Sequence, residues 1–145
     1  MKRYLHIKVR SKTGASESIE FAGVMAMLLI LFYLFLMAYP VFITKANVEV
    51  FTADLVRKIE TTGAIDDTIN TYASELADLY GMNPVINYDA DFIAGTKKIQ
   101  IRDSFKVAVE TSETIMLLDG TLYEPITLEI PIGDQRVGIS EKLWK

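Results

Sequence analysis

The sequence predicts an α+β protein in which a long N-terminal transmembrane and amphipathic helix packs on a small antiparallel β-sheet, with one additional short helix. Three observations predict this fold: an uncharged apolar stretch over residues 21–43, a helical period that continues after it, and period-two alternation from Pro84 onward. A chain of 145 residues is long enough for one domain beside a membrane segment. We therefore expect a basic leader over residues 1–15, a spine helix over 16–62 and a head domain over 63–145.

The stretch over residues 21–43 is the expected membrane helix, because it holds no Asp, Glu, Lys or Arg. Its 23 residues extend about 34 Å as a helix, which exceeds a hydrocarbon core of about 30 Å. Helices of soluble domains typically run to only about 11 or 12 residues. Tyr33, Tyr39 and Lys45 suit the outer interface, where aromatic rings and lysine ammonium groups reach the headgroups. The stretch therefore predicts a single-pass membrane protein.

Charge differs sharply between the two sides of this stretch. Residues 1–14 carry five Lys or Arg and no acid, so residues 15–145 sum to −9 within a net charge of −4. Basic residues favour the cytoplasmic side, which predicts a cytoplasmic N-terminus and an exterior C-terminal domain in the cell membrane. The leader could be mistaken for a nucleic-acid-binding arm, but next to a membrane helix its charge is the orientation signal. The acidic exterior domain shows no concentrated basic stripe, so we expect no nucleic-acid partner.

A short segment before the apolar stretch carries a family resemblance. The sequence Gly14-Ala15-Ser16-Glu17-Ser18-Ile19-Glu20-Phe21-Ala22 resembles the processing and membrane region of type IV pilin-like proteins, and its second half especially resembles TadE-type minor pseudopilins. In that family a prepilin peptidase cuts on the cytoplasmic side after a small residue, usually Gly, and a Glu stands fifth in the mature chain. A cut after Gly14 makes Glu20 sixth from a new N-terminus at Ala15; a cut after Ala15 makes it fifth from Ser16. The resemblance implies processing and leaves the bond open.

The resemblance also implies an assembly role for Glu20 and Phe21. In pilin-like proteins this Glu is thought to pair with the free N-terminal ammonium of a neighbouring subunit as subunits leave the bilayer for a fibre. The alternative is an interfacial Glu in water beside the headgroups. The small residues Ala22, Gly23 and Ala26 would permit close approach of other pilin-like subunits. The ending over residues 138–145 also resembles that of an uncharacterised TadE-like group from Gram-positive bacteria.

The helical period continues past the apolar stretch. Val48, Phe51, Leu55 and Ile59 recur at spacings of three, four and four, which places them on one face of an amphipathic helix. Gly63 is suited to close this helix as a left-handed residue. Inside it, Pro40 removes a backbone donor and predicts a helix kink, although its position near the interface could also simply mark the exit from lipid.

A second, shorter helix is expected before the sheet. Asp66 or Asp67 can cap its start and Gly81 can end it. Its expected packing face consists of apolar and aromatic residues at helical spacing: Ile69, Tyr72, Ala73, Leu76, Leu79 and Tyr80.

Period-two alternation predicts three or four antiparallel strands in the remainder of the chain. The expected extended runs cover residues 85–92, 98–101, 105–109 and 122–132, with turns at Gly95-Thr96, Arg102-Asp103-Ser104 and Asp119-Gly120. Pro125 and Pro131 indicate that the last strand is an edge strand or is interrupted. The two-glycine segment over residues 133–138 is predicted to be a loop.

Groups suited to catalysis or to metal binding are scarce in this sequence. Cysteine is absent and the only histidine, His6, lies in the leader, so the mature domain lacks thiol and imidazole chemistry. The pair Asp89 and Asp91 lacks the further ligands of a calcium loop, and the acids of the second helix have capping and solubility roles. We expect no metal, no cofactor, no small-molecule substrate and no enzymatic activity.

Together these observations predict a pilin-like structural subunit, a minor pseudopilin of a type IV pilus or Tad-like assembly or secretion machine. Its expected partners are the membrane, a prepilin peptidase and other pilin-like subunits that contact its N-terminal helix. The alternative is an uncleaved single-pass membrane-anchored exterior domain, a structural or binding component of a surface apparatus. A membrane-tethered hydrolase would need a catalytic set that the sequence does not contain.

Overall fold

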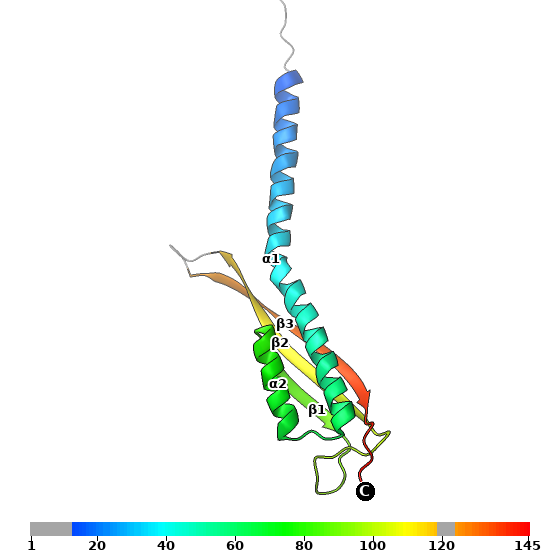
Figure 1. The fold of residues 1–145 in the computed structure, drawn as a ribbon. Helices are drawn as coiled ribbons and strands as arrows, with labels where there is room; N and C mark the ends of the chain where they lie inside the picture. Colours follow the sequence, from blue (N-terminus) through cyan, green and yellow to red (C-terminus); the bar gives the residue numbers. More distant parts are fainter. Residues whose placement is uncertain (1–12, 119–123) are drawn as a thin grey trace, which may run out of the picture. The chain divides into compact units, whose positions relative to one another are not determined.

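The computed structural model describes the backbone of residues 13–118 and 124–145, and the side chains of 18–117 and 124–145 (Figure 1). Its elements are α1 (Thr13–Thr62), α2 (Asp67–Tyr80), β1 (Val85–Ala90), β2 (Ser104–Leu118) and β3 (Ile126–Ile139). The architecture is α+β, as the sequence predicts. The chain forms two compact units, Met1–Met37 and Ala38–Lys145, and we call the second the head unit.

Helix α1 begins before the uncharged stretch and continues to Thr62 without a break. Its described side chains from Ser18 to Leu36 are all exposed, and the helix is long and apolar enough to cross a membrane. Pro40 lies inside it, and a kink at that residue stays a prediction. The helix ends as expected at Gly63, which has a φ of +67° and donates its amide to the carbonyl oxygen of Ile59 (2.7 Å).

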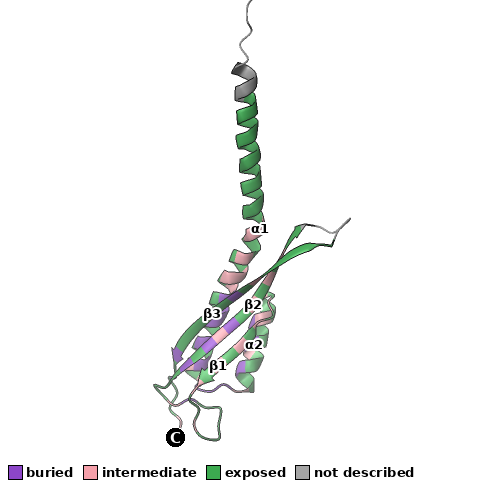
Figure 2. Ribbon diagram, turned by 180° about the vertical axis from the view of Figure 1, so that it is seen from behind, coloured by how far each residue is buried: buried purple, intermediate pink, exposed green. Residues whose placement is uncertain are grey.

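The second half of α1 supplies one wall of the hydrophobic core of the head unit. Val48, Phe51, Leu55 and Ile59, the predicted apolar face, are all fully buried. They pack with buried residues of the other elements: Ile65, Ile69, Ala73, Leu76, Ile99, Phe105, Val107, Val109 and Ile132. Both helices cover the same face of the sheet (Figures 1 and 2), and the opposite face is exposed. This is the predicted packing of a helix on a small sheet.

Helix α2 starts and stops at the residues that local signals predict. Asp66 is its N-cap, and its Oδ1 accepts hydrogen bonds from the amides of Thr68 (3.0 Å) and Ile69 (3.3 Å). Gly81 ends the helix with a φ of 61°. One predicted packing residue is wrong: Leu79 is 74% exposed, because the sheet-facing side of α2 is narrower than the spacing suggested.

The sheet has three antiparallel strands in the order β1-β2-β3, so β3 is an edge strand, where Pro131 is tolerated. Two sequence predictions about strands are wrong. Residues 98–101 form no strand, since Lys98 makes only an isolated bridge with Ala64 and a turn follows directly. The predicted loop over residues 133–138 is instead the second half of β3. The predicted turn at Asp119-Gly120 lies outside the described residues.

Gly138 shows why two glycines misled the loop prediction. It pairs with Phe105 across the sheet, and an added Cβ would meet the Phe105 ring as well as Val56 Cγ1 of α1 at 2.8 Å. The glycine is therefore needed for close packing of α1 on the sheet rather than for a turn.

Replacing Gly138 by Ala is expected to lower the free energy of unfolding by about 1–3 kcal/mol through overpacking. Chemical denaturation of the full chain in detergent micelles measures this. Gly133→Ala is the comparison variant, because its Cβ would meet only the Val109 carbonyl oxygen at 3.2 Å and the Glu110 side chain at 3.5 Å. The double variant Gly138→Ala/Phe105→Leu should lose less stability than the two single changes added together. Equal losses for Gly138→Ala and Gly133→Ala would contradict this packing role.

Candidate functional site

The exposed apolar part of α1, residues 18–36, is the first candidate functional surface. Every residue from Ser18 to Leu36 is exposed, including the predicted assembly residues Glu20 and Phe21. The small residues Ala22, Gly23 and Ala26 lie within one turn on this helix, and a Cβ built at Gly23 would have no neighbour within 4 Å. This part of the helix therefore offers an uncovered apolar surface with a shallow patch where another helix could approach closely.

The predicted processing residues lie at the start of α1. Gly14, Ala15 and Ser16 are helical in backbone, and their side chains lie outside the described set. Residues four apart on a helix share a face, so an amine at Ser16 would stand one turn from Glu20. An amine at Ala15 would be five residues away and rotated off that face. The two cleavage bonds therefore place the new amine differently relative to Glu20.

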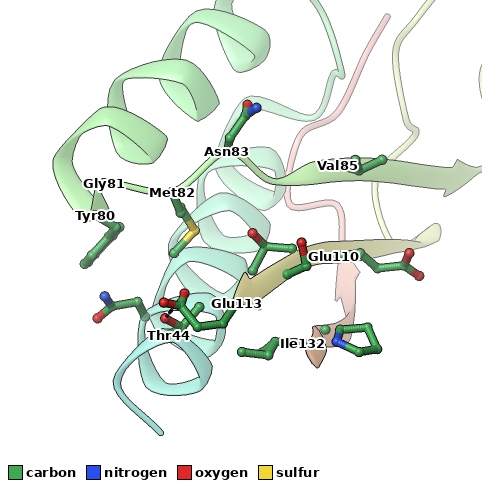
Figure 3. A pocket seen from close by; sticks show the side chains of 14 residues that line it. Thr44, Tyr80, Gly81, Met82, Asn83, Val85, Glu110, Glu113 and Ile132 are labelled. Atoms are coloured by element: carbon green, nitrogen blue, oxygen red, sulfur yellow. Dashed lines mark hydrogen bonds between the residues drawn. The ribbon is translucent and has the colours of Figure 1, made fainter. Parts of the chain in front are cut away.

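A pocket of about 730 Å³ in the head unit is the second candidate (Figure 3). Four separate parts of the chain contribute to its walls: Thr44 and Asn47 of α1, the segment after α2, the middle of β2, and β3 around Ile132. The Thr44 hydroxyl donates to Glu113 Oε2 (3.0 Å), which joins α1 to β2 across the pocket. Beside it, Lys45 Nζ donates to the Gly133 carbonyl oxygen (2.8 Å) and pairs with Glu49 (3.2 Å).

The chemistry of this pocket is limited to polar and apolar contacts. Its acidic side chains are Glu110 and Glu113, Tyr80 adds a phenol, and Thr44, Thr111 and Ser112 add hydroxyl groups. Among the described residues, no group of three or more His, Asp or Glu side chains could hold a metal ion. Asp89 lies opposite Lys106 in the sheet, and Asp91 follows the end of β1. The pocket therefore offers hydroxyl, carboxylate and apolar contacts to a ligand or a chain segment.

Comparison with known proteins places the chain in a family. The family model described as a domain of unknown function, DUF4320, matches residues 24–145. The chain belongs to the DUF4320 family. No curated protein and no solved structure matches it. The DUF4320 region starts inside the apolar stretch of α1 and includes the whole head unit, whereas the residues of the pilin resemblance, 14–22, precede it.

The end of the DUF4320 region forms a strap, residues 140–145, that the sequence did not predict. The Trp144 indole Nε1 donates to the Gly63 carbonyl oxygen (2.9 Å) at the end of α1, and Lys98 Nζ lies 4.1 Å from the centre of a Trp144 ring. The buried Ser140 hydroxyl donates to the Ile99 carbonyl oxygen (3.1 Å). The only signal in the sequence is that the single tryptophan stands next to the C-terminus. The strap fastens the end of α1 to the loop before β2.

Among the described side chains of the head unit, three have a shifted pKa, and each shift has a structural cause. Hydrogen bonding to Glu141, and then to Glu60, raises the pKa of the Arg57 guanidinium. Burial raises the pKa of the Tyr88 phenol. Burial first, and then the charge of Asp54, raise the pKa of Tyr72. All three shifts stabilise the ordinary protonation state at neutral pH.

Proposed function

We propose that this chain is a membrane-anchored, pilin-like structural subunit, a TadE-like minor pseudopilin of a type IV pilus or Tad-like assembly or secretion machine. One observation carries the proposal: a single helix joins an uncharged segment, exposed over residues 21–36, to the core of a small α+β head. The exposed segment has the length and composition of a membrane span. A helix of this kind can hold the subunit in a bilayer and later pack against other helices through the same surface.

The charge distribution supports the topology of this proposal. The first fourteen residues carry five basic side chains and no acid, and the remainder of the chain has a net charge of −9. The N-terminus is then cytoplasmic and the head unit exterior, with a prepilin peptidase acting at Gly14 or Ala15 on the cytoplasmic side.

Processing is tested by intact mass and N-terminal sequencing of the protein from its native membrane. We expect a chain that starts at Ala15 or Ser16. A start at Ser16 would place the new amine one helical turn from Glu20, and a start at Ala15 would place it off that face. A chain that starts at Met1 in a cell with active prepilin peptidase would overturn the proposal. It would favour the alternative, an uncleaved membrane-anchored exterior domain.

Replacing Glu20 by Ala is expected to leave the protein in the membrane but to reduce its incorporation into an assembly by at least about tenfold. A charge left without its counterpart in a low-dielectric contact costs roughly 3–5 kcal/mol, and about 1.4 kcal/mol is a factor of ten. The measurement compares the amount of protein in the membrane fraction with the amount in sheared or extracted assemblies. Glu17→Ala is the matched control, because it removes an acid from the same helical turn region and should incorporate normally. Normal incorporation of Glu20→Ala would contradict the assembly role.

A further inference from the structure

Strands β2 and β3 continue as a two-stranded arm past the end of β1. Strand β1 pairs only with residues 105–110 of β2, whereas β3 pairs with β2 as far as Leu118. We call residues 111–117 of β2 and 126–132 of β3 the arm. Figure 1 shows it extending beyond the rest of the sheet and away from α1.

Both faces of the arm carry exposed apolar side chains toward its outer end. Successive residues of a strand point to opposite faces, so Met116 and Leu117 lie on different sides of the arm. Met116 is 53% exposed and Leu128 is 48% exposed, and Leu117 and Ile126 are exposed as well. A surface that docks one flat partner needs only one apolar face. An arm with exposed apolar side chains on both faces is better covered by an environment that contacts both faces at once.

The arm points toward the end of the head unit where the apolar part of α1 enters. Phe105 and Gly138 lie beside Val56 of α1, whereas Glu113 accepts the hydrogen bond from Thr44, so β2 runs antiparallel to α1. From Glu113 to Leu117 the strand advances about 13 Å, and because the arm diverges from α1 only part of this advance lies along the helix, which covers about 9 Å from Thr44 back to Ala38. The outer end of the arm therefore reaches the level of residues 38–43. At that level Tyr39, Phe42 and Ile43 are also exposed.

We infer that the outer end of the arm lies in the headgroup layer of the membrane that α1 crosses, as a second lipid contact of the head unit. This inference rests on the membrane anchoring in the proposed function. Interfacial segments typically bury an apolar surface about 5–10 Å deep. This depth agrees with the distance of about 9 Å along α1 between Thr44 and Ala38, the level that the outer end of the arm reaches. The unpaired strand edges keep it out of the hydrocarbon, where each unsatisfied backbone group is costly, and leave it at a depth that contains water.

The charge of the arm specifies the kind of lipid. Between Lys106 and Arg136 the sequence holds no basic residue, and the described arm carries Glu113 and Glu129. The contact is therefore apolar in origin and is opposed by anionic headgroups. Zwitterionic lipid should hold the arm better than anionic lipid.

Single cysteines provide the test, because the natural chain has none and each introduced thiol is labelled uniquely. Full-length Leu117→Cys and Leu128→Cys, labelled with the polarity-sensitive fluorophore NBD, are reconstituted in phosphatidylcholine vesicles. Leu79→Cys on α2 and Leu143→Cys in the strap are the controls, since both positions are exposed. The two arm labels should emit at shorter wavelength and lose intensity when lipids with a headgroup nitroxide are included. The control labels should show neither change.

Several outcomes would overturn the inference. Flotation of the unlabelled chain with the vesicles checks the anchoring by itself. If the chain floats while the arm labels keep a water-like emission, the arm contact is wrong and the anchoring stands; if the chain does not float, both are wrong. A blue shift without nitroxide quenching that grows with protein density would assign the arm to a second copy of the chain. Quenching that increases when phosphatidylglycerol replaces half of the lipid would contradict an apolar, charge-opposed contact.

Discussion

Replacing Phe51 by Ala should lower the free energy of unfolding of the head unit by about 3–5 kcal/mol. Phe51 is fully buried between α1 and the sheet and is among the largest side chains of the core. Its removal takes away both the apolar burial and the packing of its neighbours, and leaves a cavity. Chemical denaturation of the full chain in micelles measures the loss, with the fluorescence of Trp144, the single tryptophan, as the probe.

Phe42→Ala is the matched control for this prediction. Phe42 lies on the same helix nine positions earlier and is 63% exposed in the head unit. Its replacement should change the free energy of unfolding by no more than about 0.5 kcal/mol, as for other surface changes. Equal losses for the two variants would show that the second half of α1 does not contribute to the core in the way its burial indicates.

Replacing Gly63 by Ala should lower the free energy of unfolding by about 2–5 kcal/mol, from two separate causes. Gly63 has a φ of +67°, where an L residue with a Cβ is strained by about 1–2 kcal/mol. Its added Cβ would also meet the Cβ of Lys142 and lie 3.1 Å from Trp144 Nε1, which adds about 1–3 kcal/mol of overpacking. The same denaturation experiment measures the total.

Gly81→Ala separates the two causes. Gly81 ends α2 with a φ of +61°, so the backbone strain is similar, but its Cβ would have no neighbour within 4 Å. The difference between the two variants is therefore the packing of the strap against the end of α1. Adding Lys142→Gly to Gly63→Ala should recover part of that difference, because it removes the side chain nearest to the new methyl group. If Gly63→Ala costs no more than Gly81→Ala, the strap does not press on the end of the helix.

The features that the sequence predicted correctly depend on neighbours in the chain. The buried face of α1 follows from a helical spacing, and the ends at Asp66, Gly63 and Gly81 follow from capping chemistry within a few residues. The four-residue alternation over 98–101 was misleading because Ile99 lies in a loop and not in a strand. Its side chain is nevertheless buried, and its amide donates a hydrogen bond to the Gly63 carbonyl oxygen (2.8 Å). Gly138 was misleading because its reason lies across the sheet in Phe105 and Val56.

The candidate sites also differ in whether their residues are close together or far apart in the sequence. Residues 14–16 and Glu20 lie in one short segment of the sequence, residues 14–22, so a resemblance in sequence was enough to identify them. The pocket brings Thr44 next to Glu113, 69 positions later, and the strap brings Trp144 to Gly63, 81 positions earlier. No local pattern encodes such pairs, because their contact depends on how β2, β3 and the C-terminal residues pack on α1.

The boundary between the two compact units falls inside α1, between Met37 and Ala38, rather than in a loop. The core of the head unit is therefore incomplete without the second half of α1, because the buried residues Val48, Phe51, Leu55 and Ile59 lie on that helix. A fragment that begins at Gly63 lacks one whole wall and should be a substrate for proteases. Under the proposed function, the helix that anchors the subunit in the membrane is therefore also the helix that completes the core of the head.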